Sequence, residues 1–206
     1  MSKIVISGYY GFANAGDEAM LTAIIKSLRS TEKSVELTVI SGDPEMTSAQ
    51  HQVNSIHRFN FLEIIKSLHG CDLLISGGGS LLQDVTSMRS LLYYLSILAL
   101  GVILKKKVML FGQGIGPINS RFLRKLTKLI CSHADLITVR DQDSLYELRR
   151  LGVPTQKVQL TADSVLTLPQ EGKDLGKGLL NAFHVPEDKM LIAISVRKWQ
   201  EDDSYL

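Results

Sequence analysis

Short apolar runs alternate along the chain with longer segments in which apolar residues recur at every third or fourth position. Runs of the first kind are typical of buried strands, and the periodic segments are typical of helices with one buried face. Strands are predicted over residues 3–6, 35–40, 53–57, 72–75, 108–111, 136–139 and 158–160. Helices are predicted over residues 17–29, 61–68, 91–104, 121–132 and 142–151, and a further short helix is predicted to begin at Pro44.

The regular alternation of strands and helices predicts the fold class. Strands separated by helices of this length are joined by crossover connections, which place the strands parallel to one another in one sheet. The expected class is α/β, a doubly wound parallel sheet with a Rossmann-like arrangement. Because the strands all run the same way, the loops that follow them gather at one edge, where such folds bind their ligands.

The pattern changes after residue 167. We expect residues 1–167 to form an amino-terminal Rossmann-like domain and residues 168–178, which are rich in Pro, Gly, Lys and Glu, to form a linker. A fresh apolar strand is predicted over residues 190–196, so residues 179–206 are expected to begin a truncated carboxyl-terminal domain. A strand that opens a second unit and has no partners after it suggests that this is the amino-terminal part of a longer protein.

Composition excludes several classes of function. With 206 residues and a net charge of +2, the chain carries no general positive field for nucleic acid. Its longest apolar stretch, residues 90–104, is shorter than the roughly 20 residues needed to span a membrane. Cys71 and Cys131 are expected to be buried thiols, and neither the cysteines nor the histidines have metal-site spacing. No signal peptide opens the chain, so a cytoplasmic location is expected.

The first glycine-rich loop, residues 7–18, follows the first strand. Asp17 is predicted to be the N-cap of the following helix, with Glu18 beside it. These two negative charges disfavour a phosphate at the helix start, whereas they suit the hydroxyls of a sugar, whose proton one of them could remove. The alternative is that Asp17 only caps the helix and Glu18 only favours its dipole, and the sequence leaves both interpretations open.

The second glycine loop, residues 77–80, is predicted to open another helix and has no acid before Asp84. Its backbone N–H groups could form an anion-binding nest, or the loop could be a tight turn under a packed helix. Arg140, at the end of a later strand, could hold an anion or pair with an acid at the sheet edge.

The third glycine loop, residues 112–117, has the spacing G-x-G-x-G and lacks the acid that a dinucleotide fingerprint requires. No Walker A motif occurs in the sequence. The helix over 121–132 combines basic and apolar residues, which is typical either of a solvated helix or of one that contacts an anionic membrane surface.

Five segments together resemble the polysaccharide pyruvyl transferases, most closely the CsaB type of Gram-positive bacteria. They are GYYGFANAGDEAML (8–21), ISGGGSLLQDVTS (75–87), FGQGIGP (111–117), VRDQDS (139–144) and ISVRKW (194–199). The resemblance covers nearly the whole chain. It departs at Ala13, where the family's motif has glycine, so the loop is expected to be slightly strained if that position needs a positive φ.

The resemblance implies a transferase that moves pyruvate from phosphoenolpyruvate onto a sugar of a cell-wall polysaccharide, commonly a mannosamine unit, as a cyclic ketal with release of phosphate. It implies no cofactor and no metal. It also implies a two-domain architecture like that of glycosyltransferase B, with the donor-binding arginine and the acid histidine largely in the carboxyl-terminal domain. This chain would then carry the acceptor side, and whether it is active alone stays open.

The resemblance also suggests roles for individual residues. Asp17 or Glu18 would act as base or hydroxyl orienter, and Arg140 would offset charge in the cleft. The second loop would hold an anionic group, and Arg197 is a weaker candidate for the donor carboxylate. The substrate-binding set is Gly11, Asn14, Gly16, Gly78, Gly79, Ser80, Gln83, Asp84, Arg89, Gln113 and Arg197.

Several alternatives stay open at this stage. The partners are expected to be phosphoenolpyruvate and a cell-wall glycan or lipid-linked saccharide. Peripheral contact with the inner face of the membrane and assembly into a homo-oligomer are further hypotheses. The main rival function is a nucleotide-sugar glycosyltransferase of the same architecture, and another is a non-catalytic glycan-binding half.

Overall fold

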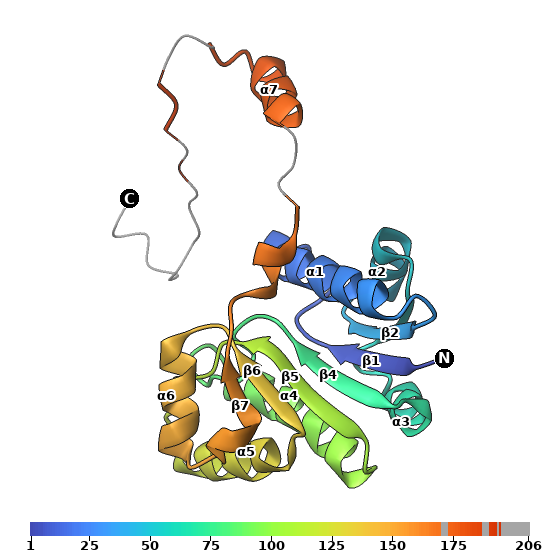
Figure 1. Ribbon diagram of the computed structural model, residues 1–206, viewed down its shortest axis with the longest axis vertical. Coiled ribbons are helices and arrows are strands. Elements are labelled where there is room, and N and C mark those ends of the chain that lie inside the picture. The colour runs from blue at the N-terminus through green and yellow to red at the C-terminus, as the bar shows by residue number, and fades with distance from the viewer. Residues whose placement is uncertain (170–172, 187–189, 193, 195–206) are drawn as a thin grey trace. The chain divides into compact units, whose positions relative to one another are not determined.

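The computed structural model describes residues 1–169, 173–186, 190–192 and 194. Its centre is a parallel sheet of seven strands in the order β3-β2-β1-β4-β5-β6-β7 (Figure 1). The strands are β1 (Lys3–Ser7), β2 (Glu36–Ser41), β3 (Asn54–His57), β4 (Leu73–Gly77), β5 (Lys107–Gln113), β6 (Leu136–Val139) and β7 (Val158–Leu160). This confirms the predicted α/β class with a Rossmann-like sheet.

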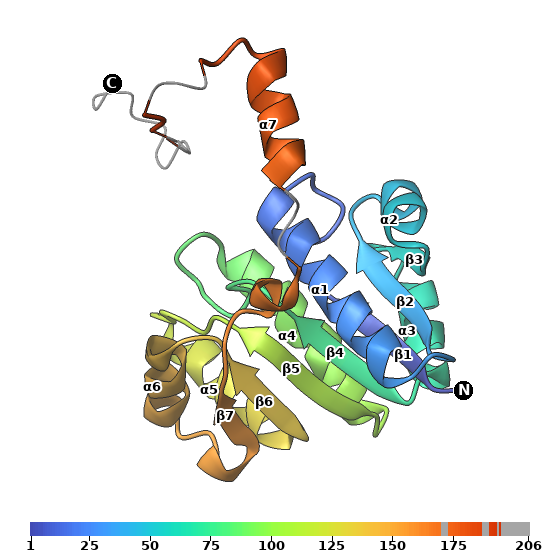
Figure 2. The same ribbon diagram turned by 45° about the horizontal axis from the view of Figure 1, so that its top comes forward.

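Helices cover both faces of the sheet (Figure 2). They are α1 (Ala15–Thr31), α2 (Pro44–His51), α3 (Phe61–Gly70), α4 (Met88–Ile103), α5 (Arg121–His133) and α6 (Gln142–Leu151), with 3₁₀ turns η1 (Thr155–Lys157) and η2 (Ser164–Thr167). Helix α1 packs on one face through Leu21, Ile24 and Ile25. Helices α3 to α6 supply the larger core of the opposite face, which contains both free cysteines as predicted.

One predicted helix start is wrong. The second glycine loop does not open a helix: residues 81–87 are irregular, and α4 begins only at Met88 with Ser87 as its N-cap. Leu82 forms a bridge to Ile115, and the Gln83 side chain accepts hydrogen bonds from the backbone N–H groups of Val85 and Thr86. Such local side-chain acceptors compete with helical hydrogen bonds, which explains the irregular segment.

Residues 1–168 form one compact unit, and residues 169–206 belong to another. The second unit contains α7 (Lys173–Ala182), so a helix begins within the part that its composition predicted to be a linker. The strand predicted over 190–196 is not formed by residues 190–192 and 194, and its other residues lie outside the described ones. In the described part of the chain, no helix is long and apolar enough to cross a membrane.

Candidate functional site

The three glycine loops meet at the carboxyl edge of the sheet, as a parallel sheet requires. The backbone N–H of Gly114 donates to the carbonyl of Gly79 at 2.9 Å. The Gln113 amide donates to the carbonyl of Gly78 at 3.0 Å, and the Tyr10 hydroxyl donates to the carbonyl of Gly77 at 2.6 Å. The second loop is therefore held by the first loop on one side and the third on the other.

The N-cap of α1 is Asn14, not Asp17 as predicted. The Asn14 side-chain oxygen accepts hydrogen bonds from the backbone N–H groups of Gly16 and Asp17, at 3.1 and 3.4 Å. The residue before it, Ala13, has a φ of +55°. A glycine would adopt that conformation without cost, whereas alanine has a steric penalty of about 1–2 kcal/mol. Asn14 and Gly16, both expected to bind substrate, thus serve the start of the helix.

Glu18 points into the protein. It is 7% exposed; its Oε1 accepts the backbone N–H of Gly11 at 2.8 Å, and its Oε2 lies 3.3 Å from Nε2 of His51. A buried carboxylate committed to two partners is a structural brace. Both carboxylate oxygens of Glu18 thus have partners inside the protein, so the structure supports a structural role for Glu18, and its predicted role as a base stays a prediction. Gly11 was also predicted to bind substrate, but its N–H donates to the Glu18 carboxylate.

Asp17 lies toward the second loop. A Cβ atom placed on Gly79 would be 3.1 Å from Asp17 Oδ1, so the carboxylate is beside the Gly79 backbone. Burial, followed by the negative charge of Asp17, raises the pKa of the neighbouring Tyr10 hydroxyl well above its ordinary value. The structure thus separates the two acids of the first loop, with Glu18 inside the fold and Asp17 at the edge.

Two backbone donors of the predicted anion nest are used inside the protein. The Gly78 N–H donates to the carbonyl of Phe111 at 3.0 Å, and the Gly79 N–H donates to the sulfur of Met20 at 3.1 Å. The nearby Asp17 carboxylate would also repel an anion. Both glycines have a positive φ, which is typical of the tight turn in the alternative interpretation, although no helix follows the loop directly.

Arg140 is held at the edge by three side chains. Its Nη1 is 3.0 Å from Asp163 Oδ2, its Nε is 3.5 Å from Asp141 Oδ2, and its Nη2 donates to the Ser80 hydroxyl at 2.9 Å. A Cβ atom on Gly114 would lie 2.5 Å from the Ser80 hydroxyl, so this arrangement requires glycine at position 114. Of the two predicted alternatives for Arg140, the structure shows pairing with acids of the sheet edge.

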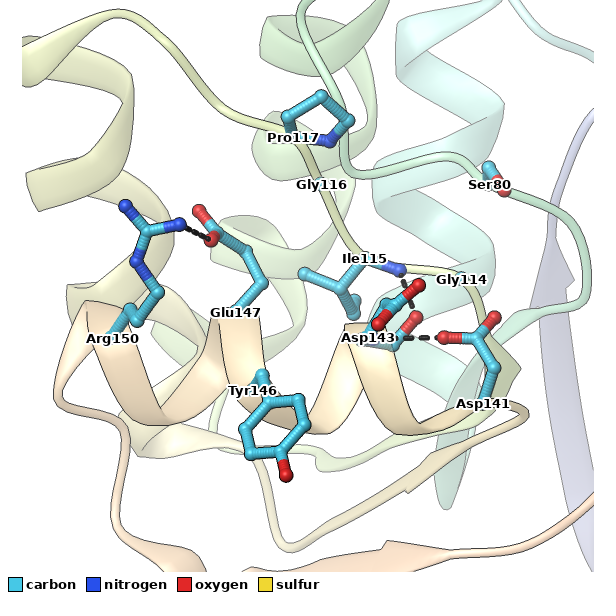
Figure 3. A pocket seen from close by; sticks show the side chains of 11 residues that line it. Ser80, Gly114, Ile115, Gly116, Pro117, Asp141, Asp143, Tyr146, Glu147 and Arg150 are labelled. Carbon is cyan, nitrogen blue, oxygen red and sulfur yellow. Dashed lines mark hydrogen bonds and ion pairs between the residues drawn. The ribbon is translucent and has the colours of Figure 1, made fainter.

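A pocket of about 430 Å³ lies next to this cluster (Figure 3). Segment 114–117 forms one wall and the first turns of α6 the other, with Ser80 at one end. Ser144 holds the two walls together because its hydroxyl accepts the Ile115 N–H at 2.8 Å. The carboxylates of Asp141, Asp143 and Glu147 line the pocket, and Glu147 also pairs with Arg124 and Arg150.

Asp143, Tyr146 and Glu147 were not predicted to be site residues, although the Asp141–Ser144 segment lies in one of the motifs that resemble the family. The available signal was the spacing of these residues along one helix that starts at a strand's carboxyl end. Asp141 is also the N-cap of α6, through the Ser144 N–H at 2.8 Å. Burial alone would raise the pKa of Asp141, but the hydrogen bonds from Ser144 and the charge of Arg140 lower it, so it is an anion at neutral pH.

The other predicted substrate-binding residues lie elsewhere or have structural partners. Asp84 accepts the N–H groups of Asn119 and Ser120, each at 2.8 Å, and so fixes the start of α5. Gln113 is fully buried. Arg89 lies in the exposed first turn of α4, and Arg197 lies outside the described residues.

Helix α5 has the predicted amphipathic pattern. Leu123, Thr127, Ile130 and Cys131 are buried. Arg121, Phe122, Lys125, Lys128 and Leu129 are exposed. Contact of this face with a membrane stays a prediction. Among the described residues, no three His, Cys, Asp or Glu side chains converge as a metal site would require.

Comparisons with known proteins provide independent information. The family model described as polysaccharide pyruvyl transferase matches residues 14–204 of the chain. The amylovoran biosynthesis protein AmsJ of Erwinia amylovora is 25% identical over an alignment of length 246, which covers 99% of this chain and 58% of AmsJ. The chain thus spans little more than half the length of this curated relative.

Solved structures show the same fold. HepE of Anabaena in complex with UDP-glucose matches with a TM-score of 0.59 and 12% identity, over 89% of this chain and 50% of HepE. UDP-GlcNAc 2-epimerase of Methanocaldococcus jannaschii matches with a TM-score of 0.57 and 12% identity, over 88% of this chain and 53% of the epimerase. At such low identity these matches establish the α/β, Rossmann-like fold alone.

Proposed function

This chain belongs to the polysaccharide pyruvyl transferase family, and we propose that it forms the acceptor side of an enzyme that transfers pyruvate from phosphoenolpyruvate to a polysaccharide sugar. The product is a cyclic ketal, and phosphate is released. The observation that carries the proposal is the family match over residues 14–204. The more specific assignment to the CsaB type stays a prediction.

The charges at the sheet edge support the acceptor role. Asp141 and Asp163 pair with Arg140, Asp143 lines the adjacent pocket, and Asp17 lies beside Gly79 of the second loop. Phosphoenolpyruvate carries a carboxylate and a phosphate, and this acidic cluster disfavours both. Neutral sugar hydroxyls, in contrast, donate hydrogen bonds to carboxylates. The donor's anionic groups then require cations other than Arg140, which is already paired.

The proposed reaction balances without a cofactor. An acid protonates the methylene carbon of phosphoenolpyruvate, which leaves an oxocarbenium-like centre at the next carbon. One sugar hydroxyl forms a C–O bond to this centre and loses its proton; the C–O bond to phosphate then breaks, and a second hydroxyl closes the ring. The two hydroxyl protons replace the one added to carbon and the one taken up by the leaving phosphate.

Asp17 is the proposed base or hydroxyl orienter. It lies at the sheet edge, where its carboxylate adjoins the backbone of Gly79 in the second loop. A positioned general base contributes about 10²–10⁴-fold to the rate of such a step. Arg140 is assigned a positioning role, because it fixes Ser80 and Asp141 beside the pocket.

The setting of the reaction is part of the proposal. The acceptor is a cell-wall glycan or lipid-linked saccharide, and the reaction takes place in the cytoplasm, at the inner face of the membrane. There the exposed Arg121, Lys125 and Lys128 of α5 would face anionic lipids, with Phe122 and Leu129 reaching into the interface.

A phosphate-release assay tests the proposal. The protein in its natural length is incubated with phosphoenolpyruvate, with and without cell-wall polysaccharide isolated from the producing cells. Phosphate release that requires the polysaccharide, with a pyruvate ketal on the recovered glycan, is the expected result. Release of UDP from a UDP-sugar in its place would support a glycosyltransferase, and glycan binding without any turnover would support a binding protein.

A further inference from the structure

Three aromatic side chains surround Arg58 at the same edge of the sheet, and a fourth stacks on one of them. Tyr9 and Phe12 come from the loop after β1, Phe59 follows β3, and Tyr93 comes from α4. The guanidinium carbon of Arg58 lies 5.2 Å from the ring centre of Phe12, 4.8 Å from that of Phe59 and 4.6 Å from that of Tyr93. These residues form what we call the aromatic surface.

Three of the four rings of the aromatic surface are exposed to solvent, and Tyr93 is half-buried. Tyr9 and Phe12 stack on each other, with ring centres 4.3 Å apart and planes 12° from parallel, and they are 38% and 39% exposed. Phe59 is 60% exposed. Leaving three rings in water side by side forgoes the stabilisation that burying each would give. Such a group of rings indicates a place where a ligand is received.

Arg58 gives the aromatic surface a polar centre. Its backbone is fixed, because its N–H donates to the Ser41 carbonyl at 2.8 Å and its carbonyl accepts the Tyr93 hydroxyl at 3.1 Å. Its guanidinium forms no ion pair with an acid of the described residues, and its Nε is buried without a hydrogen-bond partner. Cation–π contacts hold the charge, but they leave N–H donors for an acceptor that the described chain does not supply.

The aromatic surface is next to the acidic edge. The Tyr94 hydroxyl is buried without a hydrogen-bond partner, in a side chain only 2% exposed. Burial is the main cause that raises its pKa; Arg58 opposes this, and Tyr93, Asp17 and Tyr9 add to it. The charges of Arg58 and of Asp17 thus both act on this hydroxyl, so the aromatic surface and the proposed base both lie within electrostatic range of it.

A ligand for such a surface needs a flat apolar face and oxygen acceptors on its rim. A pyranose ring has both, because its axial C–H groups stack on aromatic faces while its ring-edge oxygens accept hydrogen bonds from a guanidinium. An acyl chain would use the rings but leave the Arg58 donors unsatisfied. A free phosphate would use Arg58 but not the stacked pair.

We propose that the aromatic surface is a glycan subsite, in which Tyr9, Phe12 and Phe59 stack on a pyranose ring and Arg58 donates to its oxygens. The inference rests on the proposed function in one respect: the bound ring is the sugar that neighbours the one modified near Asp17. The subsite then selects acceptors that are longer than one sugar.

Binding to an array of defined bacterial cell-wall and capsular oligosaccharides tests the subsite directly. The wild-type protein in its natural length is compared with Phe59→Ala, Arg58→Met and Arg58→Lys. Phe59→Ala and Arg58→Met are expected to weaken oligosaccharide binding about tenfold. Arg58→Lys keeps the positive charge and is expected to bind more tightly than Arg58→Met but less tightly than the wild type. Ile103→Ala, which removes an exposed apolar side chain from the last turn of α4, serves as the matched control and is expected to bind like the wild type.

Thermal unfolding shows that each variant folds, and the outcomes separate the hypotheses. Equal binding by all variants, or no oligosaccharide bound, would overturn the subsite. The subsite would also be overturned if the variants lost only the binding of UDP, which would assign the surface to a nucleobase, or only the binding of anionic vesicles, which would assign it to lipid. If the variants weaken glycan binding but the wild type releases no phosphate, the subsite is supported and the proposed reaction is overturned. If phosphate release requires the acceptor but the acceptor KM of Phe59→Ala is unchanged, the reaction is supported and the subsite is overturned.

Discussion

The first and second glycine loops look alike in sequence, but the fold uses them differently. In the first loop the glycines let the chain turn around a buried carboxylate, because Glu18 accepts the N–H of Gly11 and meets His51. In the second loop the glycines make room for neighbours: a Cβ on Gly78 would lie 2.9 Å from the sulfur of Met20, and one on Gly79 would lie beside Asp17.

The difference shows how a glycine loop whose glycine amides donate inside the protein can still build a site. The N–H groups of Gly11, Gly78 and Gly79, which a phosphate could otherwise use, all have acceptors within the fold. The second loop instead brings Asp17 and Arg140 close together, since its Gly79 adjoins the acid and its Ser80 adjoins the arginine. The substitutions below test these assignments, from the largest expected change in the free energy of unfolding to the smallest.

Glu18→Ala should lower the free energy of unfolding by about 3 kcal/mol, because it leaves the Gly11 N–H and the buried His51 without their partner. Glu18→Gln, which keeps an acceptor for Gly11, should cost less. Urea unfolding measures both. Glu45→Ala is the matched control, since Glu45 lies exposed in the first turn of α2 and should change stability little. Equal losses in the free energy of unfolding for Glu18→Ala and Glu45→Ala would contradict the structural role of Glu18.

Gly78→Ala should cost about 2 kcal/mol, because the residue has a φ of +64° and its new methyl group would meet Met20. Gly70→Ala is the control: it lies at the end of α3 with nothing within 4 Å of its Cβ position. Chemical denaturation of the two variants gives the comparison. If Gly78→Ala were as stable as Gly70→Ala, the second loop would not be the tight turn described.

Ala13→Gly should raise the free energy of unfolding by about 0.5 kcal/mol, because relief of the positive φ exceeds the added backbone entropy of the unfolded chain. Ala15→Gly, in the first turn of α1, should lower stability instead. Thermal unfolding of the two variants shows whether each substitution raises or lowers the stability. A loss in both variants would show that position 13 does not need a glycine-like conformation.

Asp84→Asn should reduce the loss of stability in acid. Burial alone would raise the pKa of Asp84, but the N–H groups of Ser120 and Asn119 lower it below that of an unfolded chain. The stabilisation is therefore present above the unfolded pKa of about 3.9 and is lost as the pH falls through the folded value. Urea midpoints should fall less between about pH 6 and about pH 3 in the variant than in the wild type. Identical slopes would contradict the assignment.

Most of the fold could be predicted because its signals are local. Seven apolar runs became the seven strands, and α6 has the predicted bounds, Gln142–Leu151, since Asp141 caps its start and Gly152 ends it with a φ of +78°. The helix predicted after residue 80 was wrong for a local and a tertiary reason: the Gln83 side chain accepts the nearby N–H groups of Val85 and Thr86, and Leu82 is held elsewhere. Leu82 pairs with Ile115 far along the chain, and no local pattern indicates that contact.

The site was predictable in place but not in detail. Parallel strands place all three glycine loops at one edge, and the sequence shows this. It does not show that Glu18 turns inward to His51, because their contact depends on how α1 packs beside α2. Nor does it show that the N–H groups of Gly78 and Gly79 donate to the carbonyl of Phe111 and the sulfur of Met20. The aromatic surface was missed because its rings come from three separated segments.

Asp17 is proposed to act on an acceptor hydroxyl during pyruvyl transfer, and the kinetics of Asp17→Asn compared with those of Glu45→Gln decide whether it does. Both substitutions remove one negative charge from the first turn of an α-helix. With phosphoenolpyruvate and cell-wall polysaccharide, Asp17→Asn should lower kcat by about 10²–10⁴-fold, while the KM for phosphoenolpyruvate and the turnover of Glu45→Gln stay near the wild-type values. Wild-type turnover in Asp17→Asn would contradict the account.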